Sequence, residues 1–325
     1  MDYKLGDYGE SATSEEQETI RDLVPWIRNT LEKSRQLPEL TRVPLVPAAL
    51  NALAAAPPQI QKIGLNADMA TLTTAWFASV HPTLLEAAQV FQVWTMFADE
   101  STAESGKPYR GYVDLCAAAL RENHIANPDD PILTCLSTIR AKLVKLDAAM
   151  LIDELTDAMT DSNQSWVLEQ QWRKLRSYPT LAQYLAEREN IVFTYVLAVL
   201  LRAHFRLLDP IPSAVVHHAR SVSLITGLEN DLISAYHEAQ VGTPLTLLRV
   251  VQKEYDLDLQ AAIRCATALT NSLRQRCDRL GLDLLKNASL ESPLGAYIAL
   301  MNQWADICYA WHLGARRYRM NEFTI

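Results

Sequence analysis

Residues 230–238 read Asn230-Asp231-Leu232-Ile233-Ser234-Ala235-Tyr236-His237-Glu238. On an α-helix four residues turn the chain by about 400°, so Asn230, Ser234 and Glu238 form one stripe. Each of these side chains carries an oxygen, and three oxygens on one rigid face suit a hard cation such as Mg²⁺. The same spacing also occurs on the solvated face of an amphipathic helix. The rest of the chain must therefore decide between a metal site and an ordinary solvated face.

The apolar residues of the remaining sequence recur with helical rather than alternating spacing. The chain has 325 residues, of which 49% are hydrophobic and only ten are Gly, and it shows no strand pattern and no internal repeat. We therefore predict an all-α protein with one domain over residues 14–325, preceded by a disordered tail at 1–13.

Pro-rich and Gly-rich joints divide the sequence into helices that should form a bundle of ten or more around a central apolar cavity. Pro210 and Pro212 separate two of the longest segments. Helices are expected at 14–31, within 44–58, and at 82–99, 110–124, 131–147, 148–176, 180–208, 213–240, 245–280 and 292–320.

Charge and cysteine usage exclude several classes of protein. The formal net charge of −8 argues against general nucleic-acid binding, which needs a basic surface. The five cysteines are odd in number and contain no CxxC, which favours reduced thiols over disulfides or a zinc site. The sequence shows neither a signal peptide nor a membrane span, so we expect a cytoplasmic protein.

Three further groups of residues accompany the stripe. Asp99, Glu100 and Glu104 end the apolar helix that follows Pro82. Arg188 stands in the sequence Tyr184-Leu185-Ala186-Glu187-Arg188, 42 residues before Asn230, and Arg317-Tyr318 lies 87 residues after it. A guanidinium suits phosphate because its planar fork can hold two oxygens at once.

Together these segments resemble class I terpene synthases, in particular the single-domain enzymes of bacteria and fungi. Residues 230–238 resemble the second metal motif, (N/D)DxxSxxxE, and the segment from Asp99 to Glu104 resembles the aspartate-rich motif. Arg188 takes the place of an arginine that binds diphosphate about forty residues before the second motif. Arg317 and Tyr318 correspond to a C-terminal RY pair.

The resemblance implies a site for three Mg²⁺ ions and a prenyl diphosphate. The implied metal ligands are Asp99, Glu100, Asn230, Ser234 and Glu238, with Asp231 in a supporting role. Arg188, Arg317 and Tyr318 would bind the departing diphosphate. The implied reaction is ionisation of farnesyl diphosphate followed by cyclisation of the carbocation to a sesquiterpene, in a monomer or a homodimer.

The cation would need an apolar cavity with aromatic walls. Phe91 and Trp94 precede Asp99 on the same predicted helix, and Trp311 precedes Arg317. We predict that these three aromatic residues contact the substrate, although ordinary core packing is an alternative role for each.

The sequence departs from the family pattern at three places. Ala103 stands where DDxxD has its last acid, and His237 stands where many members have Lys. The segment Ile191-Val192-Phe193-Thr194 lacks the small-residue motif that follows the diphosphate-binding arginine. The participation of Glu104 and His237, and the residue that supplies the effector carbonyl, therefore stay open.

Three other functions are compatible with this pattern. The substrate of the cyclase could have another chain length, as in diterpene synthases, because cavity volume is not readable from sequence. A trans-prenyltransferase would share the fold but would need a second DDxxD motif. A non-catalytic helical binding module is the third alternative, and the departures at Ala103 and His237 keep it open.

Overall fold

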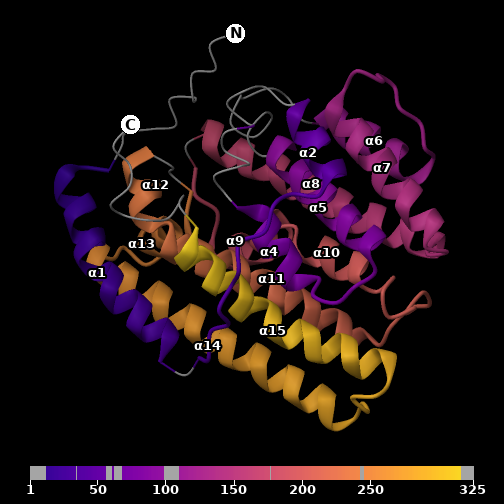
Figure 1. Cartoon of the computed structure of the whole chain (residues 1–325). Helices are drawn as coiled ribbons and strands as arrows, with labels where there is room; N and C mark the ends of the chain where they lie inside the picture. The colour runs from indigo at the N-terminus through magenta and orange to yellow at the C-terminus, as the bar shows by residue number, and fades with distance from the viewer. Residues whose placement is uncertain are drawn as a thin grey trace.

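The computed structural model describes residues 12–33, 35–55, 61, 68–98, 110–175, 177–241 and 245–315. Within these ranges every α-helix belongs to one helical assembly and no strand occurs, so the predicted all-α class is confirmed. None of the helices in these ranges is long and apolar enough to cross a lipid bilayer. Figure 1 shows the helices packed side by side, with α11 (Ser213–Ile233) near the middle of the molecule.

The first helix begins close to the predicted position. Thr13 accepts a hydrogen bond from the backbone N–H of Glu16, and the Glu16 side chain accepts from the backbone of Thr13, which forms a capping box. Ala12 already contacts α12 (Ala235–Val241), because its N–H donates to the carbonyl of Ala239 at 3.3 Å. The N-terminal elements are α1 (Ser14–Glu32), α2 (Pro47–Ala54) and α4 (Met69–Trp76), of which α4 was not predicted.

The helices in the middle of the chain pack against one another. Helix α7 contacts both α5 and α6, and α6 also contacts α8. Helix α5 starts at the proline that was predicted to open it and reaches almost to Asp99. The elements are α5 (Pro82–Ala98), α6 (Arg110–Arg121), α7 (Pro131–Lys145), the 3₁₀ turn η2 (Ala149–Leu151) and α8 (Ile152–Leu175).

Three of the long helices predicted in the C-terminal half are each two helices in the structure. The segment 180–208 breaks around Val192 and Phe193, 213–240 bends at Ser234, and 245–280 is divided near Tyr255. The elements are α9 (Leu181–Ile191), α10 (Thr194–Leu201), α11 (Ser213–Ile233), α12 (Ala235–Val241), α13 (Leu247–Glu254), α14 (Leu259–Lys286) and α15 (Pro293–Gly314).

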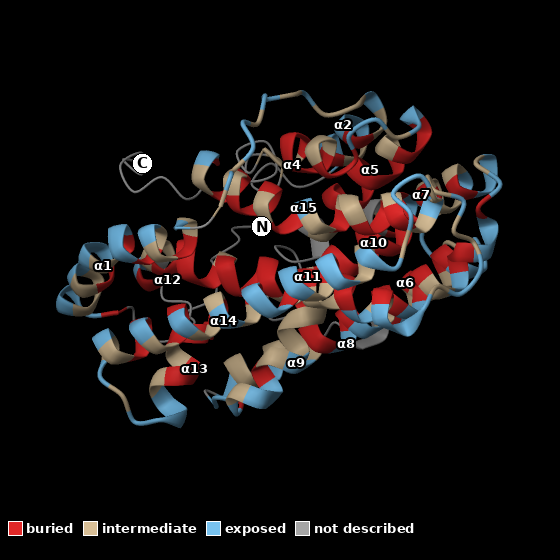
Figure 2. Ribbon diagram, turned by 90° about the horizontal axis from the view of Figure 1, so that it is seen from below, coloured by how far each residue is buried: buried red, intermediate tan, exposed pale blue. Residues whose placement is uncertain are grey.

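Helix α11 is the centre of the assembly. It contacts α9, α10, α13, α14 and α15, and most of its residues from Val222 to Ile233 are buried. The buried faces of the surrounding helices point inward toward it, and the exposed faces form the outer surface (Figure 2). Side chains carried by α11 are therefore held by neighbours on several sides, which makes this helix a rigid platform for a functional site.

Candidate functional site

The metal stripe predicted from the sequence lies across the junction of α11 and α12. Ser234 forms a bend between the two helices. Its N–H still donates to the carbonyl of Asn230 at 2.8 Å, and the N–H of Glu238 donates to the carbonyl of Ser234 at 2.8 Å. Because both bonds span four residues, the helical register continues through the bend and places Asn230, Ser234 and Glu238 on successive turns.

Ser234 is the most informative member of this stripe. Its side chain is buried, and its Oγ has no hydrogen-bond partner among the described residues. Leaving a buried hydroxyl unpaired costs about 1–3 kcal/mol, so such an atom requires an explanation. With the half-buried Asn230 and Glu238 on either side, it completes a set of amide, hydroxyl and carboxylate oxygens. That donor set fits Mg²⁺.

Asp231 faces away from the stripe and is already fully engaged. Its carboxylate accepts from the Tyr184 hydroxyl at 2.6 Å, from Arg188 Nη2 at 2.5 Å and from the Leu247 N–H at 3.3 Å. Burial raises the pKa of Asp231 to about 6, although Arg188 and the Tyr184 hydroxyl act in the opposite direction. At neutral pH the carboxylate is therefore ionised and supports Arg188 rather than facing the stripe.

Arg188 lies in the last turn of α9 and reaches across to α11. Its Nη2 donates to the Asn230 Oδ1 at 3.2 Å and to the Gly227 carbonyl at 3.3 Å, besides its bond to Asp231. Burial alone would lower the pKa of Arg188, but the Asp231 carboxylate raises it above its ordinary value, so the guanidinium stays charged. Its Nε is buried and has no hydrogen-bond partner among the described residues.

Gly227 makes this crossing of Arg188 over α11 possible, and sequence reasoning did not identify it. A Cβ at this position would lie 2.9 Å from Val192 Cγ1 and 3.2 Å from Arg188 Cγ. Gly227 is an isolated glycine inside an otherwise helical pattern, and such a glycine often marks a place where another segment packs closely against the helix. That signal could have identified it.

A helix break follows Arg188, although the small-residue motif expected there is missing. Phe193 adopts a left-handed backbone conformation with φ 56°, between the end of α9 and the start of α10. Its ring packs edge-on against Trp166 at 4.5 Å and Trp94 at 5.2 Å, and it also contacts Phe91. The tertiary contacts of the aromatic ring thus hold a conformation that is uncommon for a bulky residue.

The structure places Phe91 and Trp94, two of the predicted substrate-binding residues, in this aromatic cluster. Both side chains are fully buried on α5, with their ring centroids 5.1 Å apart. The Trp94 Nε1–H has no hydrogen-bond partner among the described residues. The cluster therefore joins the inner face of α5 to the helix break that follows Arg188.

Trp311 and His312 approach the site from α15. Trp311 is buried, and its Nε1 donates to the carbonyl of Asp68 at 3.1 Å. Its ring lies 4.8 Å from that of His312. His312 Nε2 lies 3.1 Å from the Asn230 Nδ2, so this histidine contacts the stripe directly. Sequence reasoning missed His312, because a lone histidine on an apolar helix carries no local signal.

The other predicted site residues, Asp99, Glu100, Arg317 and Tyr318, lie outside the described residues, and so do Glu104 and the backbone between α5 and α6. Helix α5 ends at Ala98 and α15 ends at Gly314, each shortly before one of these groups. In the described part of the chain no cluster of three or more His, Cys, Asp or Glu could hold a metal ion. A metal site among the described residues would therefore need the Asn230 amide and the Ser234 hydroxyl as ligands.

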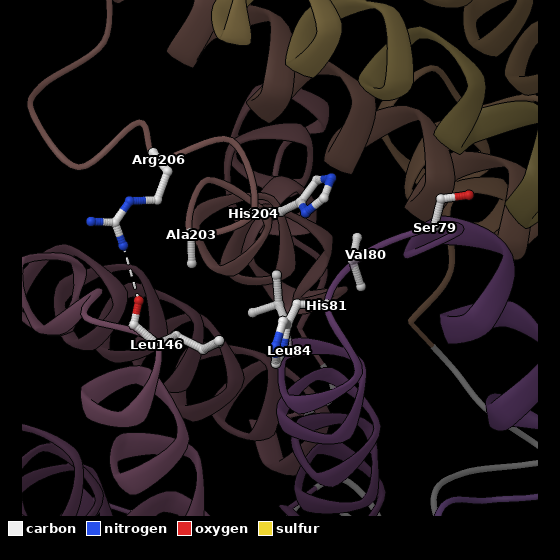
Figure 3. A pocket seen from close by; sticks show the side chains of 8 residues that line it. All are labelled: Ser79, Val80, His81, Leu84, Leu146, Ala203, His204 and Arg206. Atoms are coloured by element: carbon white, nitrogen blue, oxygen red, sulfur yellow. Dashed lines mark hydrogen bonds between the residues drawn. The ribbon is translucent and has the colours of Figure 1, made fainter.

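A separate hollow of about 440 Å³ opens at the N-terminal end of α5 (Figure 3). His81, His204 and Arg206 line it together with apolar side chains, and Arg206 is turned toward the carbonyl of Leu146 at 3.0 Å. No residue of the stripe or of the aromatic cluster contributes to it. The hollow lies at the end of α5 opposite to Ala98.

Comparison with protein families places this arrangement in a known class. The family model described as terpene synthase family 2, C-terminal metal binding, matches residues 89–276. That match covers more than half of the chain and includes α9, α11 and α12. The protein therefore belongs to this terpene synthase family and is an enzyme of the class I terpene synthase type. Comparison with curated protein sequences gives no significant match.

Solved structures with the same fold include two groups of proteins. The 2-methylisoborneol synthase from Streptomyces coelicolor A3(2), in complex with Mg²⁺ and 2-fluoroneryl diphosphate, is 17% identical with a TM-score of 0.68. The match covers 89% of this chain and 100% of that chain. The SVS_A2 protein from ancestral sequence reconstruction is 15% identical with a TM-score of 0.71, covering 94% of this chain and 88% of that chain. At these identities the likeness shows a shared fold.

Proposed function

We propose that the protein uses Mg²⁺ to ionise farnesyl diphosphate and cyclises the resulting allylic cation to a sesquiterpene. The observation that carries this proposal is the buried hydroxyl of Ser234 between Asn230 and Glu238, next to the charged Arg188; this hydroxyl has no hydrogen-bond partner among the described residues. An oxygen stripe beside a buried guanidinium suits a ligand that contains both a divalent cation and a phosphate group.

Two groups of residues would hold the cations. Asn230, Ser234 and Glu238 form one group, and Asp99 and Glu100 would form the second group across the mouth of the site. We expect three ions, as the resemblance to class I terpene synthases implies. The bound cations would neutralise the diphosphate and so make it a better leaving group.

The remaining residues bind the leaving group and protect the cation. Arg188, Arg317 and Tyr318 would donate hydrogen bonds to diphosphate oxygens, and Asp231 keeps the Arg188 side chain in place before the substrate binds. When the C–O bond breaks, its electron pair leaves with the diphosphate. The allylic cation must then be kept from water, which is the role we assign to the aromatic faces of Phe91, Trp94 and Trp311.

The substrate class has support from the structural neighbours. The bacterial synthase was solved with Mg²⁺ and 2-fluoroneryl diphosphate, and also with geranyl-S-thiolodiphosphate. Both of these ligands are prenyl diphosphate analogues shorter than farnesyl diphosphate. Geranyl diphosphate is therefore the second candidate substrate for this chain.

Incubation of the purified protein with geranyl, farnesyl or geranylgeranyl diphosphate in the presence of Mg²⁺ tests the proposal. We expect diphosphate release and a cyclic or hydroxylated fifteen-carbon product from farnesyl diphosphate, and no reaction after chelation of the metal. Turnover of another chain length alone would correct the substrate, and a longer prenyl diphosphate as sole product would indicate a prenyltransferase. No diphosphate release from any of the three would refute the proposal.

A further inference from the structure

The N-terminal end of α1 contacts both α12 and α13. The N–H of Ala12 donates to the Ala239 carbonyl on α12 at 3.3 Å. The Glu16 carboxylate accepts from Arg249 Nη1 on α13 at 2.7 Å. Figure 1 and Figure 2 both show α1 beside α12, in agreement with the contacts between the two helices. We call residues 12–17 the α1 clamp, because they connect α12 to α13.

Hydrogen bonds within the α1 clamp fix its own shape. Glu16 Oε2 accepts from the Thr13 N–H at 2.9 Å in the capping box, which leaves Oε1 for the bond from Arg249. Gln17 Nε2 donates to the Ala12 carbonyl at 2.9 Å and ties the residue before the cap to the first turn of the helix. The hydrogen bond from Arg249 lowers the pKa of Glu16, so this pair is charged at neutral pH.

The other end of α1 is fixed close to Asn230. Glu32 accepts from the Tyr309 hydroxyl at 3.1 Å, and Arg35 pairs with the buried Glu229, the residue before Asn230. Between its two ends, the apolar face of α1 lies in one buried cluster with residues of α12 and α13. Helix α1 is therefore held beside the α11 part of the metal stripe at one end and beside α12 at the other.

Helix α12 needs such support from the side. It has seven residues, which is too short for a helix to be stable alone, and it joins α11 through the bend at Ser234. The hydrogen bonds across this bend preserve the helical register, but they leave the angle between the helices to be set by packing. Among the described helices, α12 packs chiefly on α1 and α11. The position of Glu238 relative to Asn230 thus depends on α1.

Helix α13 is a suitable anchor for the clamp, because its N-terminal end is already bonded to the site. The Leu247 N–H donates to Asp231 Oδ2 at 3.3 Å, and the same carboxylate accepts from Arg188. A clamp fixed on α13 therefore holds α12 in a defined position relative to the helix that supports Arg188.

We propose that the α1 clamp positions Glu238 for metal binding by holding α12 against α13, with Glu16 and Arg249 as positioning residues. The inference rests on the proposed function, in which Glu238 is a metal ligand. The bond from Ala12 fixes α12 directly, and the charged pair fixes the clamp on α13. Both positioning residues act through α12 and belong to no part of the oxygen stripe.

Reversal of the charge at Arg249 tests this role through metal binding. In Arg249→Glu the new carboxylate faces Glu16, so the clamp is repelled from α13. Binding of Mn²⁺, as a spectroscopic substitute for Mg²⁺, is measured by electron paramagnetic resonance in the presence of inorganic diphosphate. We expect Arg249→Glu to weaken Mn²⁺ binding by about three- to tenfold.

Addition of Glu16→Gln to this variant should recover most of the Mn²⁺ affinity. The glutamine retains the capping box, and its amide can donate to the new carboxylate. No recovery in the double variant would overturn the inference. If Arg249→Glu does not fold, Arg249→Met removes the bond without adding a charge, and it should also weaken Mn²⁺ binding.

Lys253→Glu on the same helix is the matched control. It changes the net charge by the same amount, but its exposed side chain lies 5.9 Å over the Tyr178 ring rather than against α1. We expect unchanged Mn²⁺ binding in this variant. An equal loss in Lys253→Glu and Arg249→Glu would show a general effect of charge and overturn the inference.

Glu238→Ala separates the positioning of this ligand from a general loosening of the fold. If the clamp acts through Glu238, Arg249→Glu should cost no further Mn²⁺ affinity once that carboxylate is gone. An equal loss with and without Glu238 would assign the clamp a purely structural role and overturn the inference.

The same variant distinguishes this inference from the function on which it rests. If Glu238→Ala loses Mn²⁺ affinity and Arg249→Glu does not, the inference fails while the metal stripe stands. If Glu238→Ala binds Mn²⁺ like the unaltered protein, the metal stripe itself is refuted, and the positioning role with it.

Discussion

At the scale of single residues, we expect the two ends of the metal stripe, Asn230 and Glu238, to be essential for turnover but not for folding. Asn230 and Glu238 are only half-buried, so removing their side chains leaves no large cavity. We expect Asn230→Ala and Glu238→Ala each to lower kcat/KM with farnesyl diphosphate by more than about 100-fold, because the loss of a metal ligand should exceed that of a supporting residue. Steady-state kinetics with thermal unfolding measures both effects.

The control for these two variants is Gln240→Ala, which alters an exposed side chain on the same short helix as Glu238. It should behave like the unaltered protein in both assays. Near-normal rates for Asn230→Ala and Glu238→Ala would remove the stripe from the mechanism.

Another single residue, His218, should make the fold sensitive to acid. Burial lowers the pKa of His218 to about 4, partly offset by Asp278 and Asn302. Between about pH 6.5 and pH 4 the unfolded chain therefore binds a proton that the folded chain does not, so stability is lost as the pH falls. We expect this residue to cost on the order of 2–3 kcal/mol in the free energy of unfolding between pH 7 and pH 4.5.

Urea unfolding at the two pH values, for the unaltered protein and for His218→Leu, isolates this contribution. The buried Asp231 and Glu229, whose pKa values are raised, act in the opposite direction but are common to both proteins. The unaltered protein should lose more stability at low pH than the variant. An identical loss in both would show that His218 is not the group responsible.

At the scale of helices, the crossing of α9 over α11 depends on the missing side chain of Gly227. A Cβ there would contact Val192 and Arg188 at 2.9–3.2 Å, so one of the two must move. We expect Gly227→Ala to lower the free energy of unfolding by about 1–3 kcal/mol. Because Arg188 is displaced, the KM for the diphosphate substrate should also rise. Urea unfolding and substrate titration measure the two effects.

Gly314, at the end of α15, provides the comparison, because no atom of the described residues lies within 4 Å of a Cβ added there. Gly314→Ala should leave stability unchanged or raise it by up to about 1 kcal/mol, as expected for alanine in a helix. Equal behaviour of the two variants would show that Gly227 has no special steric role.

At the scale of the whole molecule, a buried ionic cluster ties the N-terminal segment to the central helices. The fully buried carboxylate of Glu229 on α11 pairs with Arg35, which follows α1, and lies 3.6 Å from Arg274 on α14. Arg35 also stacks over the ring of Tyr309 on α15 at 4.4 Å. Burial raises the pKa of Glu229, while Arg35 and Arg274 offset part of that effect.

Removal of this carboxylate should destabilise the protein strongly, because two buried arginines lose a shared partner. We expect Glu229→Ala to cost about 3–5 kcal/mol in denaturant unfolding. Arg21→Ala, which breaks only exposed pairs with Glu18 and Asp22, should cost less than about 1 kcal/mol. A small effect at Glu229 would mean that the cluster contributes little to the docking of the N-terminal segment.

The acids of the aspartate-rich segment, from Asp99 to Glu104, should differ in importance according to how this segment faces the metal stripe. Asp99 directly follows α5, so the rigid helix should direct its carboxylate toward the mouth of the site. Glu104 lies five residues further on and has a longer side chain, which loses more conformational entropy when it binds a metal. We expect Asp99→Asn to reduce kcat/KM most, Glu100→Gln less and Glu104→Gln least. A larger loss in Glu104→Gln than in Asp99→Asn would show that the ligands lie on the other face.

The sequence by itself determined the all-α class and the spacing of the metal stripe. Both depend on helical periodicity, which is a local property, and the hydrogen bonds from Ser234 to Asn230 and from Glu238 to Ser234 preserve that periodicity even where α11 and α12 meet. It also indicated Arg188 through its distance from the stripe, and the structure places the two in contact.

Only the tertiary structure decided where the predicted helix at 180–208 breaks and which residues surround the amide of Asn230. Phe193 takes a left-handed conformation because aromatic rings from α5 and α8 pack against it, and nothing in the local sequence requires that turn. Likewise, His312 is 82 residues from Asn230 and reaches it only because α15 packs on α11. Contacts of this kind depend on the packing of whole helices, which no local pattern records.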